Sequence, residues 1–519
     1  MVLVVGICFA ACAGFWLKAY NSSNQLNSHE VDSTSKDNGD RLIDKNLSVH
    51  NSEDRISDLP DELLSQIFSH LSPLDAIKKS ALSRRWRYVW LTLPCLNLDW
   101  CDLSGFRGIF HSNDCDLYKA VYVKKADQIL QRFKNQRISS FRLSFCFDRK
   151  HASNVGKWIN FAAEKHLESL SLQFICTDES FSRLDCHYDE FYVISGSFLS
   201  RIPYLKNLHL DSCRLKLHSN FTLNRLKTLD LIYVHIEETG LQSILSRLST
   251  IEWLQLRHCT NLPSKLCIGA NLQCLSFLMV SNCPDVQEIE LGAENLKTFE
   301  FVGKVALKCS FISTPNLERA YVSLTDRVNS GAAGLFKDLG NHIPSLKALF
   351  LRGEYPLINT LPKDPQLLFQ SVLRLELYTR HDDLKVDAFM ALPCLLKSFP
   401  LLEKLYLKMP YQTGARRNEL PAVQFHANLK EIEFGYFGYC WVEYASYLLR
   451  CATGLERMVI SRHQKGYVGC GKWTSLTDPM GKKESHRIYI ALLGKAASPN
   501  VKVIIHYDSG LSPGGFYLI

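Results

Sequence analysis

The feature that most constrains the fold of this chain is a short apolar block that recurs along most of its length. The block has the form Leu-x-x-Leu-x-Leu, with other apolar residues replacing leucine in some copies. Residues two apart point to the same side of an extended strand, so each block predicts a short strand with one buried face. Copies begin at Leu167, Leu205, Leu226, Ile251, Leu275, Leu296, Leu317, Leu346, Val372, Leu402, Leu429 and Leu455.

The spacing of the blocks indicates a repeat protein. From Leu205 onward the copies follow one another at intervals of about 21–30 residues, which is the period of a leucine-rich repeat. A single repeat cannot cover its own apolar face, so consecutive repeats are expected to stack into a curved solenoid with a parallel sheet on its concave side. Unrelated strands in an ordinary α/β domain would not explain so many copies of one block.

Three copies are followed by a cysteine, three residues after the last apolar residue of the block: Cys213, Cys259 and Cys283. Here the chain turns away from the sheet, and a small buried polar side chain can serve backbone groups. We therefore expect these cysteines to be structural. The 18 cysteines include no Cys-x-x-Cys pair, and no histidines stand at zinc spacing. This pattern predicts reduced thiols in a cytoplasmic or nuclear protein, with no metal site and no cofactor.

A compact unit of about forty residues precedes the repeats and has the pattern of three short helices, too small to bury a full core alone. Pro60 suits the first turn of the first helix, and Ser72 and Asp75 suit the start of the second. The apolar residues of the first and third helices lie at helical spacing: Leu63, Leu64, Ile67, Phe68, Leu71, Leu82, Trp86, Val89 and Trp90. The unit therefore carries more apolar surface than it can bury by itself.

The stretch from Leu59 to Trp90 resembles an F-box, and residues 82–90 (LSRRWRYVW) are close to the form found in plant F-box proteins. The resemblance implies a motif that docks on a Skp-type adaptor, which links it to a cullin-RING ubiquitin ligase. The alternative is an ordinary amphipathic helical hairpin within a larger core. By resemblance, the residues that form the adaptor-binding face or its support are Leu59, Pro60, Leu63, Leu64, Ile67, Leu71, Leu82, Trp86 and Trp90.

The carboxy-terminal part predicts one more strand–helix–strand unit between Phe425 and Ile460, with a helix over residues 443–452. This unit resembles the FBD domain found at the end of many plant F-box/leucine-rich-repeat proteins, a domain without clear chemistry. Residues 488–493 and 501–506 predict a last helix and strand that cap the solenoid. The glycine-rich stretch from Gly466 to Gly471 (GYVGCG) lacks the lysine and the strand–helix context of a phosphate-binding loop, and we interpret it as a loop.

The amino terminus begins with an uncharged apolar stretch from Val2 to Leu17, just short of the roughly 17–25 residues that a membrane-spanning helix needs. No basic residue precedes it, which argues against a secretory signal. Three interpretations stay open: residues 1–20 are a membrane anchor with the F-box in the cytosol, they do not belong to the mature protein, or they are a cleaved signal. The signal ranks last, because it would send the F-box away from its adaptor. Residues 21–52 are polar and predict a disordered linker.

The sequence contains no recognisable catalytic site. It has neither a phosphate-binding loop nor the Gly-x-Ser-x-Gly of a hydrolase nucleophile. His209, His235 and His258 stand near strand ends of different repeats and are expected to be surface residues. The net charge of +8 is mild for 519 residues. The sequence has no arginine-rich run, so nothing in it indicates nucleic-acid binding. We therefore expect a binding protein rather than an enzyme.

These observations define an expected fold and an expected function. The fold is α/β: a small three-helix F-box over residues 53–98, then an irregular leucine-rich-repeat solenoid with a parallel concave sheet over residues 120–394. An FBD-like unit over residues 395–465 and a carboxy-terminal cap over residues 466–519 follow.

The function implied by the resemblance is that of the substrate-recognition subunit of a Skp-cullin-F-box ubiquitin ligase. The F-box would dock the adaptor, and the concave side of the repeats would hold an unknown target protein near the ubiquitin-transfer machinery. The alternative is a leucine-rich-repeat scaffold or membrane-tethered binding protein without a role in ubiquitination.

Overall fold

The computed structural model describes residues 59–69, 86, 94–100, 103, 115–133, 137–147, 149–174, 191–217, 223–238, 240–304, 308–325, 332–353, 369–379, 396–408, 423, 425–476, 478, 480–508 and 513–518. All of them belong to one compact unit that spans Ser57–Ile519. The predictions for residues 1–20 and 21–52 lie outside the described residues. Among those that are described, no helix is long and apolar enough to cross a membrane.

The central element of this unit is a 16-stranded sheet, counted over the described residues. Neighbouring strands are parallel throughout, except for the antiparallel last pair β23–β24. Its strands, in order, are β1 (Cys95–Asp99), β2 (Ser140–Ser144), β3 (Ser169–Gln173), β5 (Asn207–Asp211), β7 (Thr228–Ile232), β9 (Trp253–Arg257), β11 (Phe277–Ser281), β13 (Thr298–Gly303), β15 (Arg319–Leu324), β16 (Ala348–Gly353), β17 (Arg374–Thr379), β18 (Lys404–Lys408), β19 (Glu431–Gly435), β20 (Arg457–Ile460), β23 (Lys502–Asp508) and β24 (Pro513–Leu518).

The strands coincide with the apolar blocks of the sequence. In β5 the leucines Leu208 and Leu210 are buried, and Leu208 stands in register with Leu229 of β7, so equivalent residues of successive repeats stack. The parallel sheet of a leucine-rich-repeat solenoid is thereby confirmed. The sheet also extends further than the pattern predicted. Strand β1 begins within residues 53–98, the range predicted for the F-box, and β2 precedes the first clear block.

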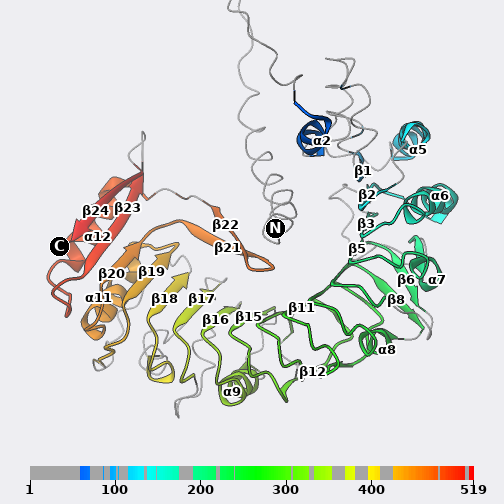
Figure 1. The fold of residues 1–519 in the computed structure, drawn as a ribbon. Helices are drawn as coiled ribbons and strands as arrows, with labels where there is room; N and C mark the ends of the chain where they lie inside the picture. Colours follow the sequence, from blue (N-terminus) through cyan, green and yellow to red (C-terminus); the bar gives the residue numbers. More distant parts are fainter. Residues whose placement is uncertain are drawn as a thin grey trace, which may run out of the picture. The chain divides into compact units, whose positions relative to one another are not determined.

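Helices and short strands line the other side of the sheet. The helices are α5 (Cys115–Arg132), α6 (Ala152–Ala163), α7 (Gly196–Leu199), α8 (Gly240–Leu245) and α9 (Ala332–His342). Two three-stranded sheets take their place elsewhere: β4 (Val193–Ser195), β6 (Arg214–Leu217) and β8 (His235–Glu238), then β10 (Lys265–Ile268), β12 (Glu288–Leu291) and β14 (Lys308–Phe311). Figure 1 shows α7, α8 and α9 along this side, with the hairpin of β21 (Gln464–Gly469) and β22 (Lys472–Leu476) on the opposite one.

A left-handed residue follows several strands and turns the chain away from the sheet. Ser212, His258 and Asn282 have φ between 50° and 56°, and each precedes one of the three predicted structural cysteines. The Cys259 thiol donates to the Leu231 carbonyl oxygen at 3.4 Å, and the Cys283 thiol to that of Leu256 at 3.7 Å. These contacts confirm the structural role for two of the cysteines. Cys213 is buried, and burial raises its pKa.

The two helices and the last strand predicted in the carboxy-terminal part are also found. The helix expected over residues 443–452 is α11 (Val442–Cys451), which lies between β19 and β20 in the sequence. The last helix is α12 (Lys482–Leu492), and the last predicted strand is β23. Gly454 lies so close to the preceding repeat that a Cβ there would stand 2.0 Å from the Ala427 carbonyl oxygen. The polypeptide of this unit therefore packs backbone against backbone.

Candidate functional site

The concave face of the sheet, the side turned away from the helices, carries one outward residue from the middle of each strand from β5 to β19. These register-aligned residues, which we call the middle row, are His209, Asp230, Gln255, Met279, Glu300, Tyr321, Phe350, Glu376, Tyr406 and Glu433. Each stands between two apolar residues of its block, so the sequence predicts that it faces outward. Nevertheless Gln255 and Glu376 are 2% exposed and Glu300 is 0% exposed. The concave face is therefore covered at these strands.

The cover is the antiparallel hairpin β21–β22, which lies across the concave side of the sheet (Figure 1). Its turn contains Gly469, Cys470 and Gly471 with φ of 95°, 55° and 71°. Glycine adopts this left-handed conformation without steric cost, so the two glycines allow a tight turn around Cys470. The prediction that residues 466–471 form only a loop is therefore wrong, because they contribute most of β21 and the turn that follows it.

The hairpin turn holds the carboxylate of Glu300, the middle-row residue of β13. The Cys470 N–H donates to Glu300 Oε2 at 2.9 Å and the Gly471 N–H to Oε1 at 3.1 Å. The Tyr467 hydroxyl donates to Oε1 as well. Successive N–H groups in a turn of this kind make a small anion-binding hollow. The glycine-rich stretch thus cradles an anion, and the anion is a side chain of the same polypeptide.

The ionisation of these groups follows from their burial. Burial raises the pKa of Glu300 above its usual value, while the hydrogen bonds from Tyr467, Cys470 and Gly471 oppose that shift. Burial, with the nearby Glu300 carboxylate, raises the pKa of Cys470 to about 12. The thiol is therefore protonated at neutral pH and donates to Gln255 Oε1 at 2.8 Å.

Aromatic rings complete the contact between hairpin and sheet. The ring centroids of Tyr467 and Tyr321 are 3.9 Å apart. Trp473 lies 4.7 Å from Tyr467, 5.5 Å from Tyr378 and 5.7 Å from Phe350, measured between ring centroids. Such pairs contribute about 0.5–1.5 kcal/mol each beyond the area that they bury. A two-stranded hairpin is marginal alone in water, so these contacts and the Glu300 hydrogen bonds hold it in place.

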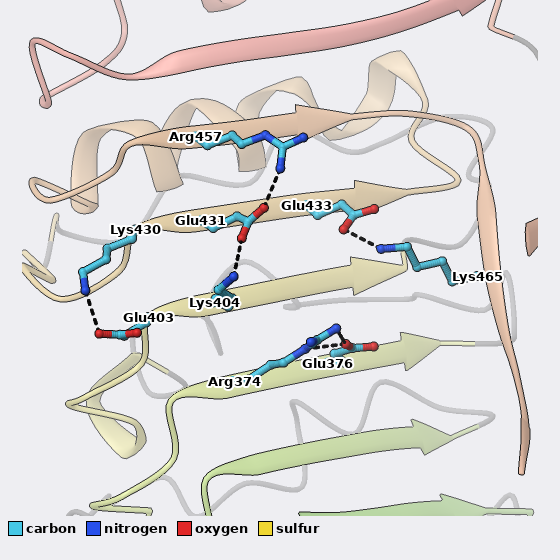
Figure 2. A network of polar contacts seen from close by, with 9 residues as sticks. All are labelled: Arg374, Glu376, Glu403, Lys404, Lys430, Glu431, Glu433, Arg457 and Lys465. Carbon is cyan, nitrogen blue, oxygen red and sulfur yellow. Dashed lines mark hydrogen bonds and ion pairs between the residues drawn. The ribbon is translucent and has the colours of Figure 1, made fainter. Parts of the chain in front are cut away.

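The concave face from β17 to β20 bears a network of opposite charges, which Figure 2 shows from close by. Glu431 of β19 lies between Lys404 at 3.0 Å and Arg457 at 2.8 Å, and so bridges three strands. Lys430 and Glu403 pair at 2.7 Å at the amino ends of the same strands. Pairs with this exposure contribute about 0–1 kcal/mol each. The network therefore sets the charge pattern of this surface and contributes little to the stability of the fold.

Two other contacts in Figure 2 have a structural role. Lys465 of β21 pairs with Glu433 of β19 at 2.6 Å and ties the base of the hairpin to the sheet. The buried Glu376 accepts hydrogen bonds from Arg374 Nε at 2.8 Å and from the Tyr378 hydroxyl at 2.6 Å. A buried carboxylate needs such partners to offset its lost hydration. The two buried carboxylates of the covered face, Glu300 and Glu376, are therefore both hydrogen-bonded.

The predicted adaptor-binding residues fall into three groups. Leu63 and Ile67 of α2 (Asp61–Ser69) are each 44% exposed, and Pro60 just before the helix is exposed as well. Leu64 is fully buried, and the half-buried Leu59 and Trp86 pack against the same apolar core. Leu63 and Ile67 are four residues apart and share one helix face. The remaining predicted residues, Leu71, Leu82 and Trp90, lie outside the described part of the chain.

The three histidines singled out from the sequence do not form a site together. His209 pairs with Asp230 at 2.7 Å, His235 contacts the Thr260 hydroxyl at 3.0 Å, and His258 stacks on Tyr233 with centroids 4.4 Å apart. Within the described residues, no three His, Cys, Asp or Glu side chains are placed to hold a metal ion. The functional residues that sequence reasoning missed are Glu300 and Tyr467. They are 167 residues apart, and no local pattern links them.

The fold and these surfaces define a class of protein, a leucine-rich-repeat solenoid preceded by an F-box. Comparison with protein-family models agrees, since the F-box-like model matches residues 56–92. A second model, described as the At1g61320/AtMIF1 LRR domain, matches residues 129–492. The chain belongs to this leucine-rich-repeat family.

Similar curated proteins come from Arabidopsis thaliana. F-box/LRR-repeat protein At3g03360 is 28% identical over 286 residues, which are 52% of this chain and 52% of that protein. FBD-associated F-box protein At5g60610 is 28% identical over 331 residues, 62% of this chain and 76% of that protein. F-box/FBD/LRR-repeat protein At5g56420 is 29% identical over 212 residues, 40% of this chain and 44% of that protein. These matches support the general role of a substrate receptor in a Skp-cullin-F-box ligase.

Proposed function

We propose that this chain docks on a Skp-type adaptor through its F-box and holds a target protein for ubiquitination on its leucine-rich repeats. It carries out no bond chemistry itself. Binding both partners raises the effective concentration of the target at the ubiquitin-loaded enzyme, which the adaptor and the cullin bring along. The compartment in which this docking takes place is the cytoplasm or the nucleus, where the chain would encounter such an adaptor.

The observation that carries this proposal is the exposed apolar pair on α2. Leu63 and Ile67 are large apolar residues, each 44% exposed, in a segment that the F-box-like model matches. Exposed apolar groups on one helix face fit a groove on a partner. By resemblance, Leu59, Pro60, Leu64, Leu71, Leu82, Trp86 and Trp90 complete or support the same face. The buried Leu64 has the supporting role, since a change there would disturb the core first.

The test is co-purification of the full chain with a Skp-type adaptor. The double variant Leu63→Asp/Ile67→Asp places two charges on the exposed face and leaves Leu64 in place. We expect it to lose the adaptor while keeping the thermal stability of the wild type. If the wild-type chain fails to capture the adaptor, the proposal is wrong.

The matched control is Ile490→Asp on α12. Ile490 is 57% exposed and lies far along the sequence from α2, so this substitution places one charge at an apolar position that is at least as solvated as Leu63 and Ile67. This variant should capture the adaptor as the wild type does. Equal loss of the adaptor in both variants would show that the effect is not specific to the F-box.

A further inference from the structure

A trough runs along the concave face beside the hairpin. It is a cavity of about 330 Å³, and Tyr467, Val468 and Gly469 of the hairpin form part of its wall. Along the sheet it is lined by the outward residue at the carboxyl end of each strand. These residues, in register from β9 to β16, are Arg257, Ser281, Val302, Ser323 and Arg352. Three small side chains between two arginines produce the hollow.

The length of the trough suits an extended polypeptide. Arg257 on β9 and Arg352 on β16 are separated by four strand spacings of about 4.8 Å, or about 19 Å in all. An extended chain advances about 3.3 Å per residue, so about six residues span that distance. A chain lying across the strands would therefore place two of its side chains, about six residues apart, near the two arginines.

The charge of the trough points to anionic side chains. The buried Nε of Arg257 has no hydrogen-bond partner. Arg352 hydrogen-bonds to the neutral Tyr321 hydroxyl, and no described residue forms an ion pair with either arginine. The nearby carboxylates have other partners: Glu300 accepts three hydrogen bonds from the hairpin, and Asp211 accepts one from the Ser212 hydroxyl. A guanidinium forms its strongest hydrogen bonds with carboxylate or phosphate oxygens.

We propose that the trough binds an extended acidic segment of the target protein, with one anionic side chain on Arg257 and a second, about six residues away, on Arg352. The inference rests on the proposed function only in identifying the bound protein as the ubiquitination target. The hairpin is a wall of this binding site. The partly exposed Val468, at 48%, stands at its rim and contacts the apolar side chains of the bound segment.

The probe is a fluorescently labelled, end-blocked heptapeptide Glu-Ala-Ser-Ala-Ser-Ala-Glu, titrated with the purified full chain and followed by fluorescence anisotropy. We expect the wild-type chain to bind the peptide with an affinity that falls as salt is added. Arg257→Gln and Arg352→Gln should each reduce this affinity at least tenfold. The matched control Arg319→Gln changes an exposed arginine at the first position of β15, outside the trough, and should bind as the wild type does.

Three further peptides define the recognised chemistry. Glutamine at both ends should abolish binding, and glutamates only two residues apart should bind no better than one glutamate. A peptide with phosphoserine at both ends identifies phosphate as the preferred group if it binds more tightly, and carboxylate if it does not. Equal binding of the glutamate and glutamine peptides overturns the proposal, and so does wild-type affinity in both arginine variants.

The arginine variants need one structural check, because Arg257 also acts on the pKa of Glu300. Hydrogen exchange of the Cys470 and Gly471 amides should stay at the wild-type rate, which shows that the hairpin is still docked. The peptide assay requires no adaptor, and the adaptor assay requires no peptide. Arg257→Gln should therefore still capture the Skp-type adaptor, so that failure of one proposal is distinguishable from failure of the other.

Discussion

Removal of a single hydroxyl tests how firmly the hairpin is fixed to the sheet. Tyr467→Phe keeps the ring that stacks on Tyr321 but deletes the hydrogen bond to the buried carboxylate of Glu300. It also removes the oxygen that accepts from the Gly471 N–H at 2.6 Å. Glu300 keeps two donors, the N–H groups of Cys470 and Gly471. A hydrogen bond to a charged group contributes about 1.5–3 kcal/mol.

That range corresponds to a roughly 10- to 150-fold larger equilibrium constant for local opening of the hairpin. The assay is native-state hydrogen exchange of the Cys470 and Gly471 amides, with denaturant unfolding to report global stability. We expect faster exchange at both amides and a smaller change in the amides of β9 and β11. The control Tyr439→Phe, at an exposed tyrosine elsewhere, should leave the hairpin amides unchanged. Wild-type exchange in Tyr467→Phe would refute the view that the buried carboxylate anchors the hairpin.

Two further predictions concern pH and packing. The pKa of Glu300 is raised in the folded chain, so protonation of this carboxyl group favours the folded state. The resulting contribution to the free energy of unfolding is fully present below the pKa of the unfolded chain and is lost as pH rises through the pKa of the folded chain. Acidification from neutrality toward the ordinary glutamate pKa of about 4.3 should therefore not release the hairpin, and amide protection corrected for intrinsic exchange would show this. Glu300→Gln should lack that pH dependence, and a wild-type hairpin that opens on mild acidification contradicts the argument. Gly454→Ala should destabilise the carboxy-terminal repeats by about 1–3 kcal/mol, because its Cβ would meet the Ala427 carbonyl oxygen; urea unfolding measures this, and an unchanged midpoint would disprove the clash.

The solenoid was predictable because its information is local and repeated. Leu229 and Leu231 are buried for the same reason as Leu208 and Leu210: each pair lies on one face of a strand that the next repeat covers. The cysteines after the strands were predictable on the same basis. Strand β2 was missed although its block fits the pattern, because Ile138 and Phe141 replace the first two leucines and only Leu143 is a leucine. The short strands opposite the sheet were missed because four-residue segments such as Arg214–Leu217 carry little periodic signal.

The covered part of the concave face was not predictable from local pattern. Glu300 stands between Phe299 and Phe301, where alternation alone predicts a solvated carboxylate. Its partners come from a glycine-rich stretch whose composition favours a loop. Only the three-dimensional structure brings Tyr467 and Cys470 to Glu300. It also shows that the hairpin forms a wall of the trough that Arg257 and Arg352 line. The adaptor-binding set remains a prediction, and the exposed residues Leu63 and Ile67 give its most direct test.

The long-range contact of the hairpin has a consequence for the order in which the chain folds. Hydrogen bonds between adjacent repeats join residues about one repeat apart, such as Lys227 and Glu252, which are 25 residues apart. The hairpin instead joins Cys470 to Glu300 across 170 residues and to Gln255 across 215. Three doublings of loop length separate these scales, and they add roughly 2 kcal/mol of closure entropy. During synthesis, the Glu300 carboxylate therefore stays hydrated until residues 467–471 have emerged. Docking of the hairpin is thus expected to be a late step, and unfolding of the last repeats would return Glu300 to water.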